Sequence, residues 1–183
     1  MNYLIDEFPK EYEGYLINSG FKTGILIAEC MVDPKVSEEE KLFIAFRMLF
    51  GKGVPPFDIA IKGLRWFLSC GETSSEDPSE VLFSFEKDHI RIFSAFMTKF
   101  GINLNNQNIH FFEFIALFND LRKTAFADVV HIRSIKPKDM KNYSRDDKAQ
   151  IMHLKHVFAL EPKYTEEQIQ AIEKFDELYG DTN

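Results

Sequence analysis

Apolar residues recur at intervals of three and four along most of the chain, which is the spacing of one buried face on an α-helix. The pattern predicts a mainly α fold of about eight helices in a compact bundle. The predicted helices cover residues 21–31, 38–50, 57–70, 86–100, 109–121, 125–132, 145–160 and 165–179.

Several predicted helix ends carry specific local signals. Ser37 and Glu40 have the spacing of a capping box, in which side chain and backbone groups satisfy each other at the first turn. Gly101 followed by Ile102 is typical of a Schellman motif at a helix C-terminus. Asn105 or Asn106 is the expected cap of the helix over 109–121.

A short β-hairpin is predicted near the N-terminus, over residues 11–17. Aromatic residues that favour strands flank Glu13 and Gly14. Gly14 can adopt the positive φ that a tight turn requires. Because an isolated hairpin is only marginally stable, it is expected to lie against the helices.

The sequence divides at an acidic, non-periodic stretch over residues 72–79, which reads as a linker. Residues 1–71 would contain the hairpin and three helices, and residues 80–183 the remaining helices. The first part is close to the size at which a single core becomes marginal. We therefore expect the two parts to pack together as one unit.

Phenylalanine is unusually frequent, with 19 residues against one Trp and six Tyr. Most fall on predicted helix faces, so they are expected in the core, together with the Trp. The core residues singled out are Trp66, Phe93, Phe96, Phe114 and Phe118. Phe112 lies about 100° from Phe111 on a helix and off the apolar stripe, so it is the expected exposed member of a binding surface.

The net charge of −7 argues against a general nucleic-acid coat, but the charge is uneven. Residues 122–155 hold nine basic and four acidic residues, and residues 156–183 hold two basic and seven acidic ones. One interpretation is charge balance between packed elements. The other is a partner-binding strip that could steer acidic stretches of a protein or meet phosphates. This strip consists of Arg133, Lys136, Lys138, Lys141, Arg145 and Lys148. Asp139, Asp146 and Asp147 interrupt it, which disfavours nucleic acid.

No motif indicates catalysis, a cofactor or a metal. His153 and His156 are three residues apart on a predicted helix, but further ligands at recognisable spacing are lacking. No nucleophile elbow or glycine-rich phosphate loop occurs. We therefore predict a protein that is not an enzyme and needs neither cofactor nor metal.

Its predicted compartment is a reducing cytoplasm. Cys30 and Cys70 lie in apolar runs, as buried thiols would. No export signal is read near the N-terminus, and no apolar run is long enough for a membrane span.

Segments spread over nearly the whole chain share one further pattern. They are Ile17-Asn18, Phe21, Asp33-Pro34, Glu40-Lys41, residues 66–71, 92–96, 100–104 and 111–119, Phe126, Val130 and residues 133–135. Together they resemble a small family of phage proteins, the gene-product-fifteen type of tailed phages and prophages of Gram-positive bacteria. The chain departs from that family at Phe111, Phe112 and Glu113, where tryptophans and a basic residue are usual, and at Asp120, where a small residue is usual.

The resemblance implies a role in tail morphogenesis. Genes of this family lie between those of the major tail protein and the tape-measure protein, a slot that usually holds tail assembly chaperones. Such a chaperone binds the tape-measure protein in the host cytoplasm and is absent from the mature virion. The alternatives are a structural component of the tail or head–tail junction and a nucleic-acid-binding accessory protein. Other tail proteins and self-association remain open as partners.

Overall fold

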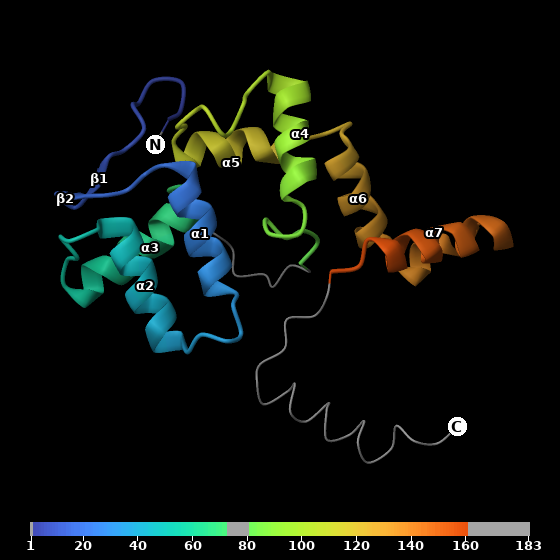
Figure 1. Ribbon diagram of the computed structural model, residues 1–183, viewed down its shortest axis with the longest axis horizontal. Coiled ribbons are helices and arrows are strands. Elements are labelled where there is room, and N and C mark those ends of the chain that lie inside the picture. The colour runs from blue at the N-terminus through green and yellow to red at the C-terminus, as the bar shows by residue number, and fades with distance from the viewer. Residues whose placement is uncertain (1, 73–80, 161–183) are drawn as a thin grey trace, which may run out of the picture.

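The computed structural model describes residues 2–72 and 81–160 (Figure 1). A short antiparallel hairpin comes first, followed by seven α-helices and one 3₁₀-helix within these residues. The elements are β1 (Glu11–Tyr12), β2 (Tyr15–Leu16), α1 (Phe21–Met31), α2 (Glu38–Phe50), α3 (Phe57–Leu68), α4 (His89–Phe100), α5 (Phe111–Asn119), α6 (Ala125–Ser134), η1 (Pro137–Met140) and α7 (Arg145–Val157). The predicted mainly α class with an N-terminal hairpin is confirmed. The helix predicted over 165–179 and nearly all of the predicted linker lie outside the described residues.

Local signals set several of these boundaries as predicted. The Ser37 hydroxyl accepts a hydrogen bond from the Glu40 amide, and the Glu40 carboxylate accepts one from the Ser37 amide. Gly101 ends α4 in the left-handed conformation, with φ of 68°. In the hairpin, Tyr12 pairs with Tyr15 across a turn in which Glu13 and Gly14 both have positive φ.

Helix α1 and helix α5 connect the two halves of the molecule (Figure 1). Helix α1 contacts α2, α3 and α5, whereas α4 packs on α6, and α6 on α7. The backbone segments that lead into α1 and α5 are far apart in sequence but are joined by two hydrogen bonds. The Phe21 amide donates to the Ile109 carbonyl at 3.0 Å, and the Phe111 amide donates to the Ser19 carbonyl at 2.8 Å. These bonds fix the start of α5 beside the start of α1.

One hydrophobic cluster draws residues from α1 to α6. Phe114 lies at its centre and stacks on Phe21 and Phe96, with ring centroids 5.2 and 5.0 Å away. Helix α1 reaches α5 closely because Gly24 has no side chain. A Cβ at Gly24 would lie 2.1 Å from a ring carbon of Phe111, so only glycine fits this crossing.

The expected cap of α5 is wrong, and the helix starts later than predicted. His110 caps it, because its Nδ1 accepts a hydrogen bond from the Phe112 amide at 3.0 Å. Its Nε2 lies 2.9 Å from the Pro9 carbonyl and can donate to it, which fits the neutral ring. Asn105 is instead part of a turn in which its amide donates to the Asn103 side chain.

The expectation that Phe112 is exposed is also wrong. Phe112 is 0% exposed and contacts rings from three directions. Tyr3 stacks on it at 6.3 Å, while Trp66 and His110 meet it edge to face at 5.3 and 4.8 Å. A helical projection assumes one covered face. Here the N-terminal segment covers a second face of α5, and sequence periodicity cannot predict that long-range contact.

Candidate functional site

The principal candidate site is an apolar groove with a volume of about 700 Å³. It is lined by the C-terminal end of α1, residues 81–85, the end of α5 and one side of α6. We call it the α6 groove. Its lining consists of Ala28, Glu29, Val32, Val81, Leu82, Phe83, Phe85, Phe118, Asn119, Leu121, Arg122, Phe126, Ala127, Val130 and His131.

Three aromatic rings form the floor of the α6 groove. Phe83, Phe118 and Phe126 contact one another with centroid separations between 5.0 and 6.1 Å. Their mutual packing gives the groove a fixed apolar base. Two aliphatic residues at its edge are left largely open to solvent, Val32 at 58% and Val81 at 75%. An apolar floor with exposed aliphatic edges can bury the apolar face of another segment.

Polar side chains stand at opposite edges of the α6 groove. Glu29 lies on the α1 side and accepts a hydrogen bond from the Phe85 amide at 3.1 Å, which holds residues 81–85 against α1. Arg122 and His131 stand on the α6 side. A segment bound here would therefore meet the positive charge of Arg122, close to the start of α6.

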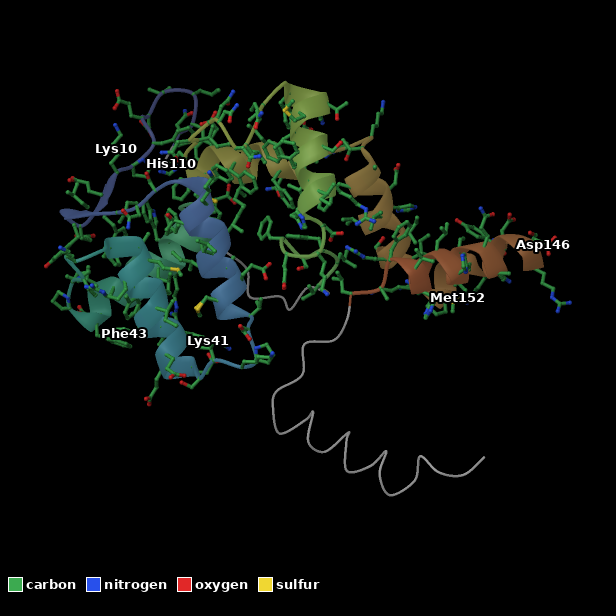
Figure 2. The ribbon with its side chains drawn as sticks, viewed as in Figure 1. Lys10, Lys41, Phe43, His110, Asp146 and Met152 are labelled. Carbon is green, nitrogen blue, oxygen red and sulfur yellow. The ribbon has the colours of Figure 1, made fainter. Side chains whose placement is uncertain are left out.

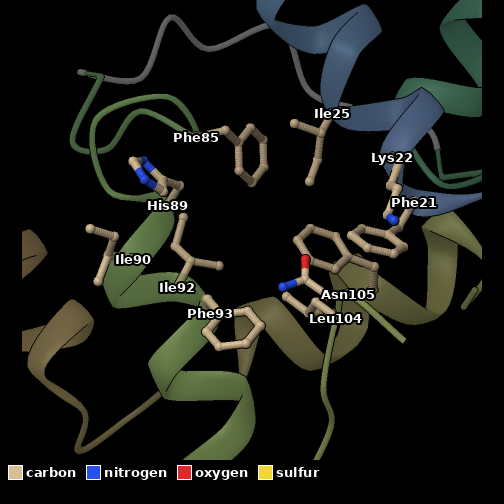
Figure 3. A pocket seen from close by; sticks show the side chains of 11 residues that line it. Phe21, Lys22, Ile25, Phe85, His89, Ile90, Ile92, Phe93, Leu104 and Asn105 are labelled. Carbon is tan, nitrogen blue, oxygen red and sulfur yellow. The ribbon is translucent and has the colours of Figure 1, made fainter. Parts of the chain in front are cut away.

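A second, smaller cavity of about 400 Å³ lies between α1 and α4 (Figure 3). We call it the α1–α4 pocket. Its walls are mostly apolar, and Lys22, His89 and Asn105 supply the polar groups at its margin. Phe85 lines both this pocket and the α6 groove, so the two cavities share a wall. The α1–α4 pocket is the smaller surface and offers no convergent polar set for a catalytic step.

The buried ion pair of Asp88 and Arg133 lies beside the α6 groove, because the same guanidinium donates to the carbonyl of Leu82, which lines the groove. The guanidinium binds both carboxylate oxygens, at 2.6 and 3.0 Å, and Asp88 is 0% exposed. Burial alone would raise the pKa of Asp88. Hydrogen bonds from Arg133 and the Ser84 amide and the charges of Arg133 and Arg91 outweigh it, so the pKa is lowered.

The predicted role of Arg133 as an exposed binding residue is therefore wrong. Its side chain is only 9% exposed, and it also donates to the Leu82 and Phe158 carbonyls, at 3.0 and 2.7 Å. It thus joins α6 to residues 81–88 and to the end of α7. A lone basic residue in a sequence gives no sign of such a partner 45 residues away.

The remaining residues of the basic strip lie around η1 and the start of α7. Lys138, Lys141 and Arg145 are exposed, whereas Lys148 is partly buried and its ammonium lies 3.4 Å from the Lys141 carbonyl. Lys136 is exposed and precedes η1, where its amide donates to Asp139. The strip is therefore not one continuous surface with Phe112, which lies in the core.

Helix α7 extends away from the body of the molecule, with Asp146 near its outer end (Figure 2). None of its residues is buried, although an apolar core face was predicted. Met152 and Val157 are each 56% exposed. The inner end is held by Lys155, whose ammonium donates to the Arg133 and Ile135 carbonyls at 2.7 and 2.6 Å. Directed polar contacts therefore hold α7 where apolar burial was expected.

Of the five predicted core residues, three are buried and two are partly buried. Phe96 and Phe114 are 0% exposed, and Phe118 is 9% exposed. Phe93 and Trp66 are partly buried and pack against the core cluster. Trp66 also contacts Tyr12 of the hairpin at 4.9 Å, so it links the hairpin to the helices.

No metal-binding arrangement occurs within residues 2–72 and 81–160, where no three His, Cys, Asp or Glu side chains converge. His153 and His156 are both exposed on α7. Cys70 is buried, which raises its pKa to about 11 and makes it a poor nucleophile at neutral pH. None of the helices in the described part is long and apolar enough to cross a bilayer.

Sequence reasoning missed the α6 groove because its lining comes from four separate segments. One signal could have indicated it. Residues 81–85 form an apolar run that follows an acidic stretch and lies outside any predicted helix. Such a run needs either a partner in the fold or one outside it.

Comparison with known proteins gives one clear match. The family described as Bacteriophage Gp15 protein matches residues 4–160. Searches of curated proteins and of solved structures found no match. The family match spans most of the chain, including every element described above and the whole lining of the α6 groove. The chain therefore belongs to the bacteriophage Gp15 protein family.

Proposed function

We propose that this phage protein is a tail assembly chaperone that binds the tape-measure protein during tail assembly in the host cytoplasm. The observation that carries the proposal is the α6 groove, an apolar groove with a volume of about 700 Å³ that the described residues leave open, in a member of a phage protein family. A tape-measure protein is a long amphipathic helical chain whose apolar stripe would otherwise aggregate. The groove can accept one such stripe in the helix-in-groove manner.

The composition of the groove suits a client with a repetitive and variable sequence. Phe83, Phe118 and Phe126 offer contact area that does not depend on exact hydrogen-bond geometry. Val32 and Val81 would become buried on binding, which adds to the driving force. Polar groups at the edge, such as Arg122, would restrict the orientation of the client.

Co-expression tests the proposal directly. The tape-measure protein of the same phage would be produced in a bacterial host with and without this protein, and its soluble fraction measured. We expect the soluble fraction to rise severalfold and the two proteins to co-purify. A tape-measure protein that stays insoluble, with no co-purification, would contradict the proposal.

Composition of the purified phage particle separates chaperone from virion component. A chaperone should be absent from the particle by mass spectrometry, whereas stoichiometric copies would identify a structural protein of the tail or head–tail junction.

Salt-sensitive retention on DNA would instead favour the nucleic-acid alternative. That result would be convincing only if substituting Lys138, Lys141 and Arg145 by Ser abolished retention, because these are exposed basic residues.

A further inference from the structure

The α6 groove lies beside the point at which the chain leaves the described residues. One guanidinium, that of Arg133, binds the Leu82 carbonyl at 3.0 Å and the Phe158 carbonyl at 2.7 Å. Leu82 lines the groove, and Phe158 follows the last residue of α7. Phe158, close to the end of the described residues, therefore lies next to the groove rather than at the outer end of α7.

The sequence of residues 161–183 has the pattern that the groove needs. Ile169, Ile172, Phe175 and Tyr179 recur at three and four residues, as one apolar stripe of a helix would. The capping box Thr165–Gln168 marks where that helix is predicted to begin.

The charge of the same segment complements the edge of the groove. Residues 161–183 contain seven acidic and two basic residues. On a helix, Glu166, Glu173 and Glu177 fall along one flank of the apolar stripe. The α6 side of the groove presents the guanidinium of Arg122. The acidic flank and the basic edge would face each other when the stripe enters the groove.

We propose that residues 165–179 are the occupant of the α6 groove and dock there as an amphipathic helix of the same chain. Burial of the stripe covers Val32 and Val81, which the described residues leave 58% and 75% exposed. The acidic flank then lies along α6, beside Arg122.

The geometry of the tether favours this contact over binding between separate chains. Four residues, 161–164, can span at most about 14 Å, which suits a binding surface beside Phe158. A helix over 165–179 would be about 22 Å long. A short tether holds a segment at an effective concentration on the order of millimolar, so modest contact energy keeps the groove occupied.

The docked segment deepens the proposed function, and this consequence rests on that function. If the tape-measure protein uses the same groove, it must displace residues 165–179. The docking itself does not depend on the identity of any client.

Photo-crosslinking in the full chain, with no client present, tests the docking. A benzoyl group would be introduced on the ring of Phe175 as p-benzoylphenylalanine, which preserves the phenyl ring. The matched control carries the same residue in place of Gln170, which is predicted to face away from the stripe. After irradiation, crosslinked peptides would be mapped by mass spectrometry in the monomer band.

We expect position 175 to crosslink within the monomer to residues 81–85, 118–122 or 126–131, at least tenfold more than position 170. A second measurement, amide hydrogen exchange of the full chain, should show faster exchange in those three segments for Phe175→Asp than for Gln170→Asp. Crosslinks between chains would assign the groove to a second copy and overturn the proposal. Crosslinks elsewhere, or equal yields from both positions, would overturn it too. No client is used in these two measurements. A negative result would therefore overturn the docking without deciding the co-expression test of the proposed function.

Discussion

Helices α5 and α7 are held in the fold in opposite ways. Helix α5 buries Phe111, Phe112, Phe114 and Phe118 among its nine residues, whereas α7 buries none of its thirteen. Ring packing on several sides determines the position of α5. A few directed bonds to Arg133 and Lys155 determine that of α7. Ring packing therefore fixes the helix at the centre of this molecule. Hydrogen bonds of Arg133 and Lys155 fix the helix at its edge, next to the α6 groove.

The largest effect is expected from truncating Phe112. Phe112→Ala removes a ring that is 0% exposed, so it should lower the free energy of unfolding by about 4 kcal/mol. Phe43, which is 67% exposed on α2, provides the control, and Phe43→Ala should change it by less than about 0.5 kcal/mol. Denaturant unfolding measures both. Equal effects would show that α5 is not covered on its second face.

Removal of the Arg133 guanidinium should have the next largest effect. Arg133→Leu leaves the Asp88 carboxylate buried and unpaired, which should cost about 3 kcal/mol at neutral pH. Helix α7 should also exchange its amides faster, because the bond to Phe158 is lost. The double variant Arg133→Leu/Asp88→Leu should recover part of the stability but not the protection of α7. If Arg133→Leu changes neither the free energy of unfolding nor the amide exchange of α7, the hydrogen bond from Arg133 to Phe158 does not hold α7 in place.

The close crossing of α1 and α5 predicts a somewhat smaller effect. Gly24→Ala places a Cβ within 2.4 Å of three ring carbons of Phe111, so overpacking should cost about 2 kcal/mol despite the higher helix propensity of Ala. Gly53→Ala is the control, because its Cβ would meet no atom closer than 3.9 Å. The melting temperatures of the two variants show whether the close packing of α1 on α5 requires glycine at this position. A stabilised Gly24→Ala protein would contradict the described packing.

The smallest effect concerns the cap of α5. Burial lowers the pKa of His110, although the Pro9 carbonyl and the charge of Glu113 oppose the shift. The folded state thus favours the neutral ring. This contribution to stability is complete above the ordinary pKa of 6.5 and is lost as the pH falls below it, through the lowered folded-state pKa.

The variant His110→Asn keeps a capping side chain but cannot titrate. Between pH 7 and pH 5 its free energy of unfolding should fall by less than that of the unchanged protein. Denaturant unfolding at the two pH values measures the difference. Parallel pH profiles would mean that His110 is not the titrating group.

Sequence reasoning succeeded where the determinants are local. The capping box of Ser37 and the left-handed Gly101 act within a few residues, and both are seen as predicted. It failed where a distant segment decides the outcome. Tyr3 covers Phe112 across more than 100 residues of sequence, and Asp88 withdraws Arg133 from the surface. The α6 groove is of this second kind, because four separate segments build it.

Binding of the client in the α6 groove can be tested with a matched pair of valine variants. Val32 and Val157 have nearly equal exposure, 58% and 56%, and each lies at a helix C-terminus. Glu in place of either has a similar local cost, but only Val32 lines the groove. Capture of the tape-measure protein would be quantified by co-purification with each variant. We predict that Val32→Glu lowers capture at least tenfold while Val157→Glu leaves it within twofold. Equal capture by both variants would contradict binding of the client in this groove.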